Sequence, residues 1–444
     1  MPAASRRQFM MTAGAVLTQG SPNERVNVAV VGFHGRGRAH YRAFAKIPNV
    51  RVSVLCDADE RLFPEAVAEV EKLAGYRPAT EPDIRRLLER KDVDAVSIAT
   101  PDYWHALMTI WACQAGKDVY VEKPVSFTVV EGRRMVEAAR KYKRIVQAGQ
   151  NMRSEGRMRA AMRMLHEGKL GKVYRAKMDI VKPRGSIGRV QESSIPQGVN
   201  WDLYLGPSPY RAFTTNRFHY GWHFFWDTST TDVGNTGVHH LDAARWGLNK
   251  HVHPVKIHST GGYYAWDSDQ ETPNFQVGTL EYADGTVIDF ELTNLYSPPT
   301  EGSNIYYTSE GYLTSDGGWK AFRGVFASRA GAAEVSPAGV SERATNASFP
   351  RATYTPVPPP AEEPTVSHFE NFVNCVRSRK VEDLYCDILE GHMSATLCHL
   401  ANISYRTGRK LVFDPQTERF VGDREADRYL TRTYREPYVL PEKV

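Results

Sequence analysis

A glycine-rich turn near the N-terminus has the residue types and spacing that bind phosphate groups. Residues 32–37 read GFHGRG and follow a run of mostly β-branched residues at 26–31. Glycines in such a turn let backbone N–H groups approach a pyrophosphate at the N-terminus of the following helix. The pattern is close to the dinucleotide-binding fingerprint, with a histidine in place of the middle glycine. The phosphate contacts that it predicts are Gly32, His34, Gly35, Arg36 and Gly37.

Asp57 lies twenty residues after Gly37, at the end of the second predicted strand. A carboxylate at this place accepts a hydrogen bond from the ribose 2′-hydroxyl of NAD and repels the 2′-phosphate of NADP. The pattern therefore predicts a nicotinamide cofactor and favours NAD over NADP.

Two further segments follow predicted strands of the same sheet. The segment TPDYWH at 100–105 follows a strand at 95–98, and the tripeptide EKP at 122–124 follows a strand at 119–121. Ligands of such sheets bind at the carboxyl ends of the strands, so both segments are expected at the cofactor crevice. Pro124 restricts Lys123 to an extended or turn conformation, which helps to fix the direction of the lysine. The predicted cofactor contacts here are Thr100, Pro101, His105, Glu122 and Lys123.

A later segment, DVGNTGVHHLD at 232–242, places polar side chains at helical spacing. At 3.6 residues per turn, Asn235, His239 and Asp242 share one helix face. Asp232 lies one turn earlier, whereas His240 is rotated by about 100° from His239. The alternative is that these polar residues cap the helix and pack it against a sheet.

These four motifs together resemble the glucose-fructose oxidoreductase / inositol dehydrogenase / rhizopine catabolism (Gfo/Idh/MocA) family, over residues 25 to about 440. The resemblance implies a nucleotide-binding domain followed by a domain whose open sheet covers the nicotinamide and often mediates dimers or tetramers. We therefore expect a homodimer or homotetramer. In the family, the lysine of EKP and an Asp-x-x-x-His pair act near the nicotinamide, and the corresponding residues here are Lys123, Asn235 and His239.

Hydride removal from a carbinol carbon needs a group that takes the hydroxyl proton. His239 is the expected general base, and Lys123 would hold the developing alkoxide. Where many family members have aspartate, this chain has Asn235, whose amide can orient His239 but cannot stabilise an imidazolium by charge. Its basicity would then depend on Asp232 or Asp242.

An aromatic stretch at 218–226 reads FHYGWHFFW. Aromatic rings stack on the C–H surfaces of sugars, and they equally pack protein cores, so both interpretations stay open. The candidate substrate contacts are Gln150, Arg153, His223, Trp226, His240 and Asp242.

The leading interpretation is an NAD(P)-dependent oxidoreductase that transfers a hydride between nicotinamide and a carbon of a sugar, glycoside or polyol. One alternative is a redox-neutral glycoside hydrolase or lyase, in which transient oxidation at C3 acidifies the neighbouring C–H, β-elimination breaks the glycosidic bond, and the hydride is returned. A second alternative is a non-catalytic binding protein of the same fold, against which Lys123 and His239 argue.

The elements that must position these residues change character near residue 150. Strands alternate with helices over 25–150, which predicts an α/β Rossmann domain with a doubly wound parallel sheet. Residues 151–444 read as an α+β domain with a large open, mainly antiparallel sheet. It includes a strand at 173–181, a helix at 232–248, and a hairpin of strands at 278–282 and 286–292. Residues 329–365 are expected to be an exposed loop, followed by helices at 368–377 and 387–405 and a polar tail.

Composition excludes several classes of protein. The 444 residues are 41% hydrophobic and 24% charged, which is enough apolar surface for more than one core. The formal charge is +5 with acids interleaved, so a nucleic-acid partner is not predicted. No apolar run reaches the length of a membrane span. The five cysteines form no CxxC pair, so they are interpreted as buried small hydrophobes, and no metal site is predicted.

Residues 1–24 are interpreted as a leader. The sequence SRRQFM at 5–10 precedes a mildly apolar stretch and resembles a twin-arginine export signal. The alternative is a disordered basic tail on a cytoplasmic protein. Export would favour an enzyme that keeps and reuses tightly bound NAD, because that route carries proteins with their cofactor already loaded.

Overall fold

The computed structural model describes residues 25–297, 303–316, 318–326, 352–358 and 360–444. The predicted leader at 1–24 and most of the predicted loop at 329–365 lie outside the described residues.

The first part of the chain folds as a six-stranded sheet in the order β3-β2-β1-β4-β5-β6, and every pairing in it is parallel. The strand order reverses between β1 and β4, and open α/β sheets bind ligands at such a switch point. The strands are β1 (Val26–Val31), β2 (Val50–Cys56), β3 (Ala79–Glu81), β4 (Ala95–Ile98), β5 (Asp118–Val121) and β6 (Val146–Ala148).

Helices cover both faces of this sheet, so every residue of β4 and β5 is buried. Two separate clusters of buried side chains lie on its two faces. The predicted parallel, doubly wound Rossmann fold is thereby confirmed. The helices are α1 (Arg36–Phe44), α2 (Phe63–Ala74), α3 (Ile84–Glu89), α4 (Asp102–Gln114) and α5 (Val129–Lys141).

The second sheet has ten strands in the order β14-β13-β12-β11-β7-β10-β9-β8-β15-β16. All of its pairings are antiparallel except that of β7 with β10, which confirms the predicted large, mainly antiparallel sheet. The strands are β7 (Val173–Val181), β8 (Lys256–Gly262), β9 (Phe275–Glu281), β10 (Val287–Thr293), β11 (Asn304–Thr308), β12 (Gly311–Thr314), β13 (Lys320–Phe326), β14 (Ala352–Val357), β15 (Leu411–Asp414) and β16 (Arg419–Phe420).

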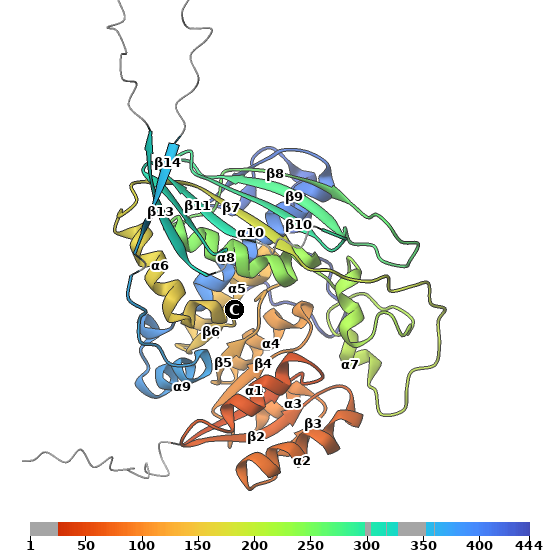
Figure 1. The fold of residues 1–444 in the computed structure, drawn as a ribbon. Coiled ribbons are helices and arrows are strands. Elements are labelled where there is room, and N and C mark those ends of the chain that lie inside the picture. The colour runs from red at the N-terminus through yellow and green to blue at the C-terminus, as the bar shows by residue number, and fades with distance from the viewer. Residues whose placement is uncertain (1–24, 298–302, 317, 327–351, 359) are drawn as a thin grey trace, which may run out of the picture.

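Figure 1 shows α8 and α10 between the large sheet and the parallel sheet. Helix α10 packs against α5 of the first sheet layer and also against β8 of the second, so it joins the two. Asp387 caps α10 by accepting a hydrogen bond from the backbone N–H of Leu389. The helices of this part are α6 (Gly156–His166), α7 (Trp201–Leu205), α8 (Val238–Gly247), α9 (His368–Ser378), α10 (Ile388–Thr407) and α11 (Arg424–Asp427).

Local patterns predicted several elements closely. The strands at 26–31, 95–98 and 173–181 have the predicted bounds, and the predicted hairpin is the antiparallel pair of β9 and β10. Its turn contains Gly285 with φ of +82°, a conformation that glycine adopts without strain. All five cysteines are buried, as predicted. None of the helices in the described part of the chain is long and apolar enough for a bilayer span.

Two predictions about the C-terminal part were wrong. The predicted exposed loop contains β14, which pairs with β13 at the edge of the large sheet, a place where the missing N–H of Pro356 is tolerated. The segment after α10, predicted to be a polar tail, is also folded. Widely spaced apolar residues among its charges pack into two hydrophobic cores. Phe420 and Leu430 join the core of the large sheet, and Tyr438 joins the core of the parallel sheet.

Candidate functional site

A pocket of about 270 Å³ lies at the carboxyl ends of β1, β2, β4 and β5. Ten of the eleven predicted cofactor contacts line it, and only Gly37 does not. A Cβ at Gly37 would lie 2.0 Å from the carbonyl oxygen of Gly32, so this glycine lets the helix pack against the turn. The predicted contacts in the lining are Gly32, His34, Gly35, Arg36, Asp57, Thr100, Pro101, His105, Glu122 and Lys123.

The glycine-rich turn leaves room for a ligand at one position. Gly32 has φ of +76°, and a Cβ there would lie 2.7 Å from the backbone nitrogen of Thr100. Gly35 precedes the first turn of α1, and a Cβ there would meet nothing within 4 Å. A backbone open at a helix N-terminus fits an approaching pyrophosphate.

Two backbone N–H groups hold the Asp57 carboxylate at the end of β2. Its Oδ2 accepts a hydrogen bond from the N–H of Phe33 at 2.9 Å, and its Oδ1 accepts one from the N–H of Asp59 at 3.0 Å. Burial raises the pKa of Asp57 to about 6. The carboxylate therefore has a fixed orientation in the pocket wall, where the ribose of a dinucleotide would lie.

A cap formed by residues 182–231 closes one side of this pocket. It runs out from β7 past α7, at the side of the molecule in Figure 1, and returns to the segment before α8. Asn200 donates to the carbonyl of Ala58 at 2.9 Å, and the hydroxyl of Tyr103 donates to the carbonyl of Tyr204 at 2.8 Å. The cap is thus tied to the parallel-sheet layer at both β2 and α4.

His34 contacts the cap directly. Its ring stacks on that of His219 with centroids 3.6 Å apart, and His219 Nε2 lies 3.1 Å from Asp59 Oδ2. Burial lowers the pKa of His219 to about 4. The histidine at the middle-glycine position thereby joins the turn to the cap. The sequence held no local sign of His219, because 185 residues separate it from His34.

Glu122 is a buried carboxylate with two cationic or polar neighbours. Arg36 Nε donates to its Oε1 at 2.9 Å, and His40 Nε2 lies 3.0 Å from the same oxygen. Burial acts to raise the pKa of Glu122, but the hydrogen bond from His40 and the charges of Arg36 and Lys123 hold it well below its usual range. Glu122 is therefore ionised beside Lys123.

Lys123 reaches from the pocket wall to the segment before α8. Its Nζ donates to the backbone carbonyl of Asn235 at 2.6 Å and to Asn235 Oδ1 at 3.3 Å. Burial lowers the pKa of Lys123. Asn235 Nδ2 in turn donates to Asp232, whose carboxylate pairs with Arg184 at 2.6 Å. Lys123 thus meets a carbonyl and an amide, while Asp232 is already neutralised.

The predicted regular helix over 232–248 was wrong at its start. Val233–Gly237 form a π-helical turn, and α8 begins at Val238. A Cβ at Gly234 would lie 2.1 Å from Thr230 Oγ1, so glycine is needed where this wide turn passes the cap. A wide turn changes the phase of the side chains, and no hydrogen bond in the described part of the chain joins Asn235 to His239.

His239 does not line the pocket, although the charge of Lys123 acts on its ring. Its Nδ1 is buried and makes no hydrogen bond to any described residue. Burial and the charge of Lys123 together lower the pKa of His239 to about 3. The imidazole is therefore neutral at physiological pH.

Asp102 belongs to the pocket, although only its neighbours in the TPDYWH segment were predicted contacts. Its Oδ2 accepts from the hydroxyl of Thr230 at 2.6 Å, and its Oδ1 is buried with no partner among the described residues. Burial raises the pKa of Asp102 to about 7. Its position inside the motif was the available signal.

The predicted substrate contacts separate into two groups. His223 lines the pocket together with Tyr220 and Trp222 of the cap. Trp226 lines a different cavity, and His240 Nδ1 lies 2.8 Å from Asn304 Oδ1 on β11. Phe218 of the aromatic stretch packs in the small core of the cap, whereas sugar stacking by the residues that line the pocket stays a prediction.

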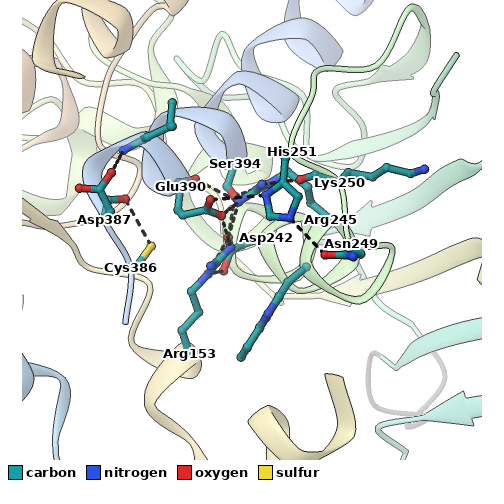
Figure 2. A network of polar contacts seen from close by, with 12 residues as sticks. Arg153, Asp242, Arg245, Asn249, Lys250, His251, Cys386, Asp387, Glu390 and Ser394 are labelled. Atoms are coloured by element: carbon teal, nitrogen blue, oxygen red, sulfur yellow. Dashed lines mark hydrogen bonds and ion pairs between the residues drawn. The ribbon is translucent and has the colours of Figure 1, made fainter. Parts of the chain in front are cut away.

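Arg153 and Asp242 lie in a buried ion network (Figure 2). Arg153 Nη2 lies 2.8 Å from Asp242 Oδ1 and 3.1 Å from Glu390 Oε2. Arg245 completes the network, at 2.5 Å from Glu390. Gln150 lies nearby, where its Oε1 accepts from Cys386 Sγ at 3.6 Å. None of these side chains lines the pocket. The charges of the network balance one another, as buried charges in a stable protein must.

One cluster outside the pocket has metal-ligand types. His253 Nε2 and His392 Nε2 each lie 2.8 Å from Glu418 Oε1, within a buried group. Arg133 also donates to both oxygens of Glu418, at 3.0 and 2.6 Å. Because a guanidinium already balances the carboxylate, the cluster is accounted for as a hydrogen-bonded tie between α5, α10 and the β15–β16 turn.

Two family models match the chain. A model described as "Oxidoreductase family, NAD-binding Rossmann fold" matches residues 26–150. A second, described as "Oxidoreductase family, C-terminal alpha/beta domain", matches residues 185–296 and 351–440.

Similar proteins come from several bacteria. A "Glycosyl hydrolase family 109 protein" of Saccharopolyspora erythraea is 33% identical over 156 residues, which is 34% of this chain and 34% of that protein. The chain thus matches about a third of the length of this curated relative.

Two crystal structures share the fold. The aldose-aldose oxidoreductase of Caulobacter crescentus has a TM-score of 0.63 at 16% identity, covering 88% of this chain and 100% of its own. The WlbA dehydrogenase of Bordetella pertussis, in complex with NADH and UDP-GlcNAcA, has a TM-score of 0.61 at 19% identity, covering 88% and 99%.

Proposed function

Because the chain belongs to the Gfo/Idh/MocA family of oxidoreductases and has its NAD-binding Rossmann domain, we propose that it transfers a hydride between NAD and a carbon of a sugar, glycoside or polyol. The observation that carries this proposal is Lys123, which reaches into the pocket from the end of β5 and is held there by Asn235. Polar groups that can change protonation converge at this place, as hydride transfer from a hydroxyl-bearing carbon requires.

The residues that would hold NAD are those of the pocket wall: the turn at Gly35 for the pyrophosphate and Asp57 for the ribose. When bound, nicotinamide accepts or supplies the hydride at C4. Cap residues Tyr220, Trp222 and His223 would cover the substrate side and exclude water.

We propose that Lys123, rather than His239, exchanges the proton of the substrate hydroxyl. Lys123 lines the pocket, and burial lowers its pKa, which makes the neutral amine easier to form during proton exchange. His239 has a pKa of about 3, so an imidazolium is unfavourable there, and it would serve as a neutral hydrogen-bonding group beside Lys123. This assignment differs from the sequence-based expectation, in which His239 is the general base and Lys123 holds the developing alkoxide.

A second candidate is the redox-neutral cleavage of a glycoside, in which the same NAD is oxidised and reduced within one turnover. The cap favours it, because a cofactor enclosed behind hydrogen bonds from Asn200 and Tyr103 would be retained and reused. Similarity to a glycosyl hydrolase over about a third of its length agrees with this candidate.

The test uses the purified full-length protein. Mass spectrometry of the nucleotide that copurifies should give NAD. A panel of sugars, polyols and nitrophenyl glycosides is then assayed for NADH absorbance and for aglycone release. Stoichiometric NADH supports the dehydrogenase, whereas release without net NADH supports the redox-neutral reaction. Absence of both, from protein that contains NAD, would refute both candidates.

Export and oligomeric state belong to the same proposal. We propose that the twin-arginine pair Arg6 and Arg7 directs export with NAD loaded, and that the chain assembles as a dimer or tetramer. Replacing both arginines by lysine should retain the protein in the cytoplasm, as fractionation measures. Light scattering of the purified protein gives the assembly mass.

A further inference from the structure

A second cavity, of about 360 Å³, lies behind the cap segment that borders the cofactor pocket. Its walls come from the loop at Trp226, the C-terminal half of α10 and the folded tail at 428–433. Thr230 lines this cavity, while its hydroxyl donates to Asp102 in the wall of the first pocket. The two cavities therefore lie on opposite sides of the same short segment.

The cavity has an excess of positive charge. Three arginines and one carboxylate, Asp227, belong to its lining. Asp227 is already paired with Arg211, at 2.5 Å, and with Arg217, while Arg432 pairs with Glu131 at 2.9 Å. For the other two arginines, Arg406 and Arg428, no described carboxylate lies within ion-pair distance. Two uncompensated guanidinium groups thus border one cavity.

Arg406 is held in a fixed orientation. Its guanidinium carbon lies 4.7 Å from the centre of the Trp226 ring and 4.3 Å from that of Tyr429. The Arg406 side chain is exposed, so a ligand can reach its guanidinium. Contact with two rings restricts the guanidinium plane, so that its N–H groups are directed before an oxyanion arrives.

The other walls suit an organic ligand. Trp226 offers an aromatic ring of the kind that packs on the C–H face of a sugar. Ser229 and Asn402 add a hydroxyl and an amide at the same cavity. We propose that this cavity binds a carboxylate or phosphate group carried on a sugar, with Arg406 and Arg428 on the oxyanion and Trp226 on the sugar ring. The proposal concerns a second site and does not depend on the reaction at Lys123.

Calorimetric titration of the full-length protein with its copurified nucleotide tests the proposal. The probes are glucuronate, glucose 6-phosphate, glucose and inorganic phosphate. We expect glucuronate or glucose 6-phosphate to bind with an affinity that falls as salt is added. The difference between their two affinities shows whether the site prefers a carboxylate or a phosphate. Glucose and inorganic phosphate should each bind at least about tenfold more weakly, since each lacks half of the recognition.

Variants locate the site. Arg406→Gln with Arg428→Gln should weaken sugar-acid binding at least about tenfold, whereas Arg424→Gln, an exposed arginine of α11 outside this cavity, should not change it. Arg428→Gln alone, at an exposed position, serves if the double variant does not fold. Absence of sugar-acid binding, equal binding of inorganic phosphate, or undiminished binding by the arginine variants would each overturn the proposal. Lys123→Met should leave the titration unchanged, which separates this site from the proposed reaction.

Discussion

The cofactor pocket and the ion network around Arg153 contain the same kinds of side chain in opposite states. In the network, Arg153, Asp242 and Glu390 meet opposite charges at 2.8–3.1 Å. In the pocket, the Lys123 ammonium donates to the carbonyl and the amide of Asn235, and the buried Asp102 Oδ1 has no partner among the described residues. Charge in the network is balanced within the protein, whereas the pocket leaves polar groups for a ligand to satisfy.

The directions of the pKa shifts follow the same division. Pairing raises the pKa of Arg153 and lowers that of Asp242, so both stay charged. Burial lowers the pKa of Lys123 and raises that of Asp102 to about 7, which brings both groups closer to a change of protonation near neutral pH. Perturbation toward the neutral form is what acid–base chemistry requires, and perturbation toward the charged form is what a structural ion pair requires.

The largest expected effect comes from Lys123→Met. Loss of the proton-exchanging group should lower kcat by about 10³-fold, with NAD still bound. The matched control is Lys117→Met, because Lys117 is also buried but donates only to the carbonyls of Arg90 and Val93. Steady-state kinetics and urea unfolding should show a catalytic defect in the first variant and a stability defect in the second. Unchanged turnover in Lys123→Met would contradict the proposal that the pocket, unlike the ion network, contains the proton-exchanging group.

Arg153→Met should lower stability and leave catalysis largely intact, which is the opposite of the effect expected for Lys123→Met. Removing Arg153 leaves buried Asp242 with only the more distant Arg245, at 3.8 Å, as a described cationic partner, and the free energy of unfolding should fall by about 3 kcal/mol. Turnover of the folded protein should stay within about threefold of the parent, because Arg153 does not line the pocket. A variant of normal stability and much reduced kcat would instead return Arg153 to the substrate site.

His239→Asn should lower kcat by about 10-fold to 100-fold through loss of a hydrogen bond to substrate. A group with a pKa of about 3 is neutral across pH 5–9, so the variant should keep the shape of the parent pH–rate profile there. In the reverse assignment, with His239 as the general base, the acid limb of kcat would change in this variant. The profile therefore decides between Lys123 and His239.

Asp57→Asn should have the smallest effect of the four variants, and that effect should be on the preference for NAD over NADP. An amide no longer repels a 2′-phosphate, so the ratio of NADP to NAD affinity should rise by about tenfold. Fluorescence titration with each reduced cofactor, on protein stripped of nucleotide, gives the two dissociation constants. Asp59→Asn is the control, because Asp59 is engaged with Arg61 and His219. An equal change in both variants would show a general effect of charge.

The cofactor residues were predictable because each lies within a few residues of the end of a parallel strand. Strand runs such as 95–98 are local patterns, and parallel strands bring their carboxyl ends to one edge, so Thr100 and Lys123 had to lie near Gly32. The substrate contacts were harder, because what a polar side chain does depends on its partner. Glu390, which pairs with Arg153, lies 237 residues further along the chain.

The sequence by itself determined the two-sheet architecture, the dinucleotide site and the lysine that lines it, since these follow from short-range patterns of burial, glycine and strand ends. Only the tertiary structure decided which buried polar groups are paired and which are left open. It also decided that the segment before α8 is a π-helical turn, where Gly234 passes against Thr230. The physical reason is that desolvation acts on every buried charge, and whether the chain compensates it depends on residues that meet only after folding.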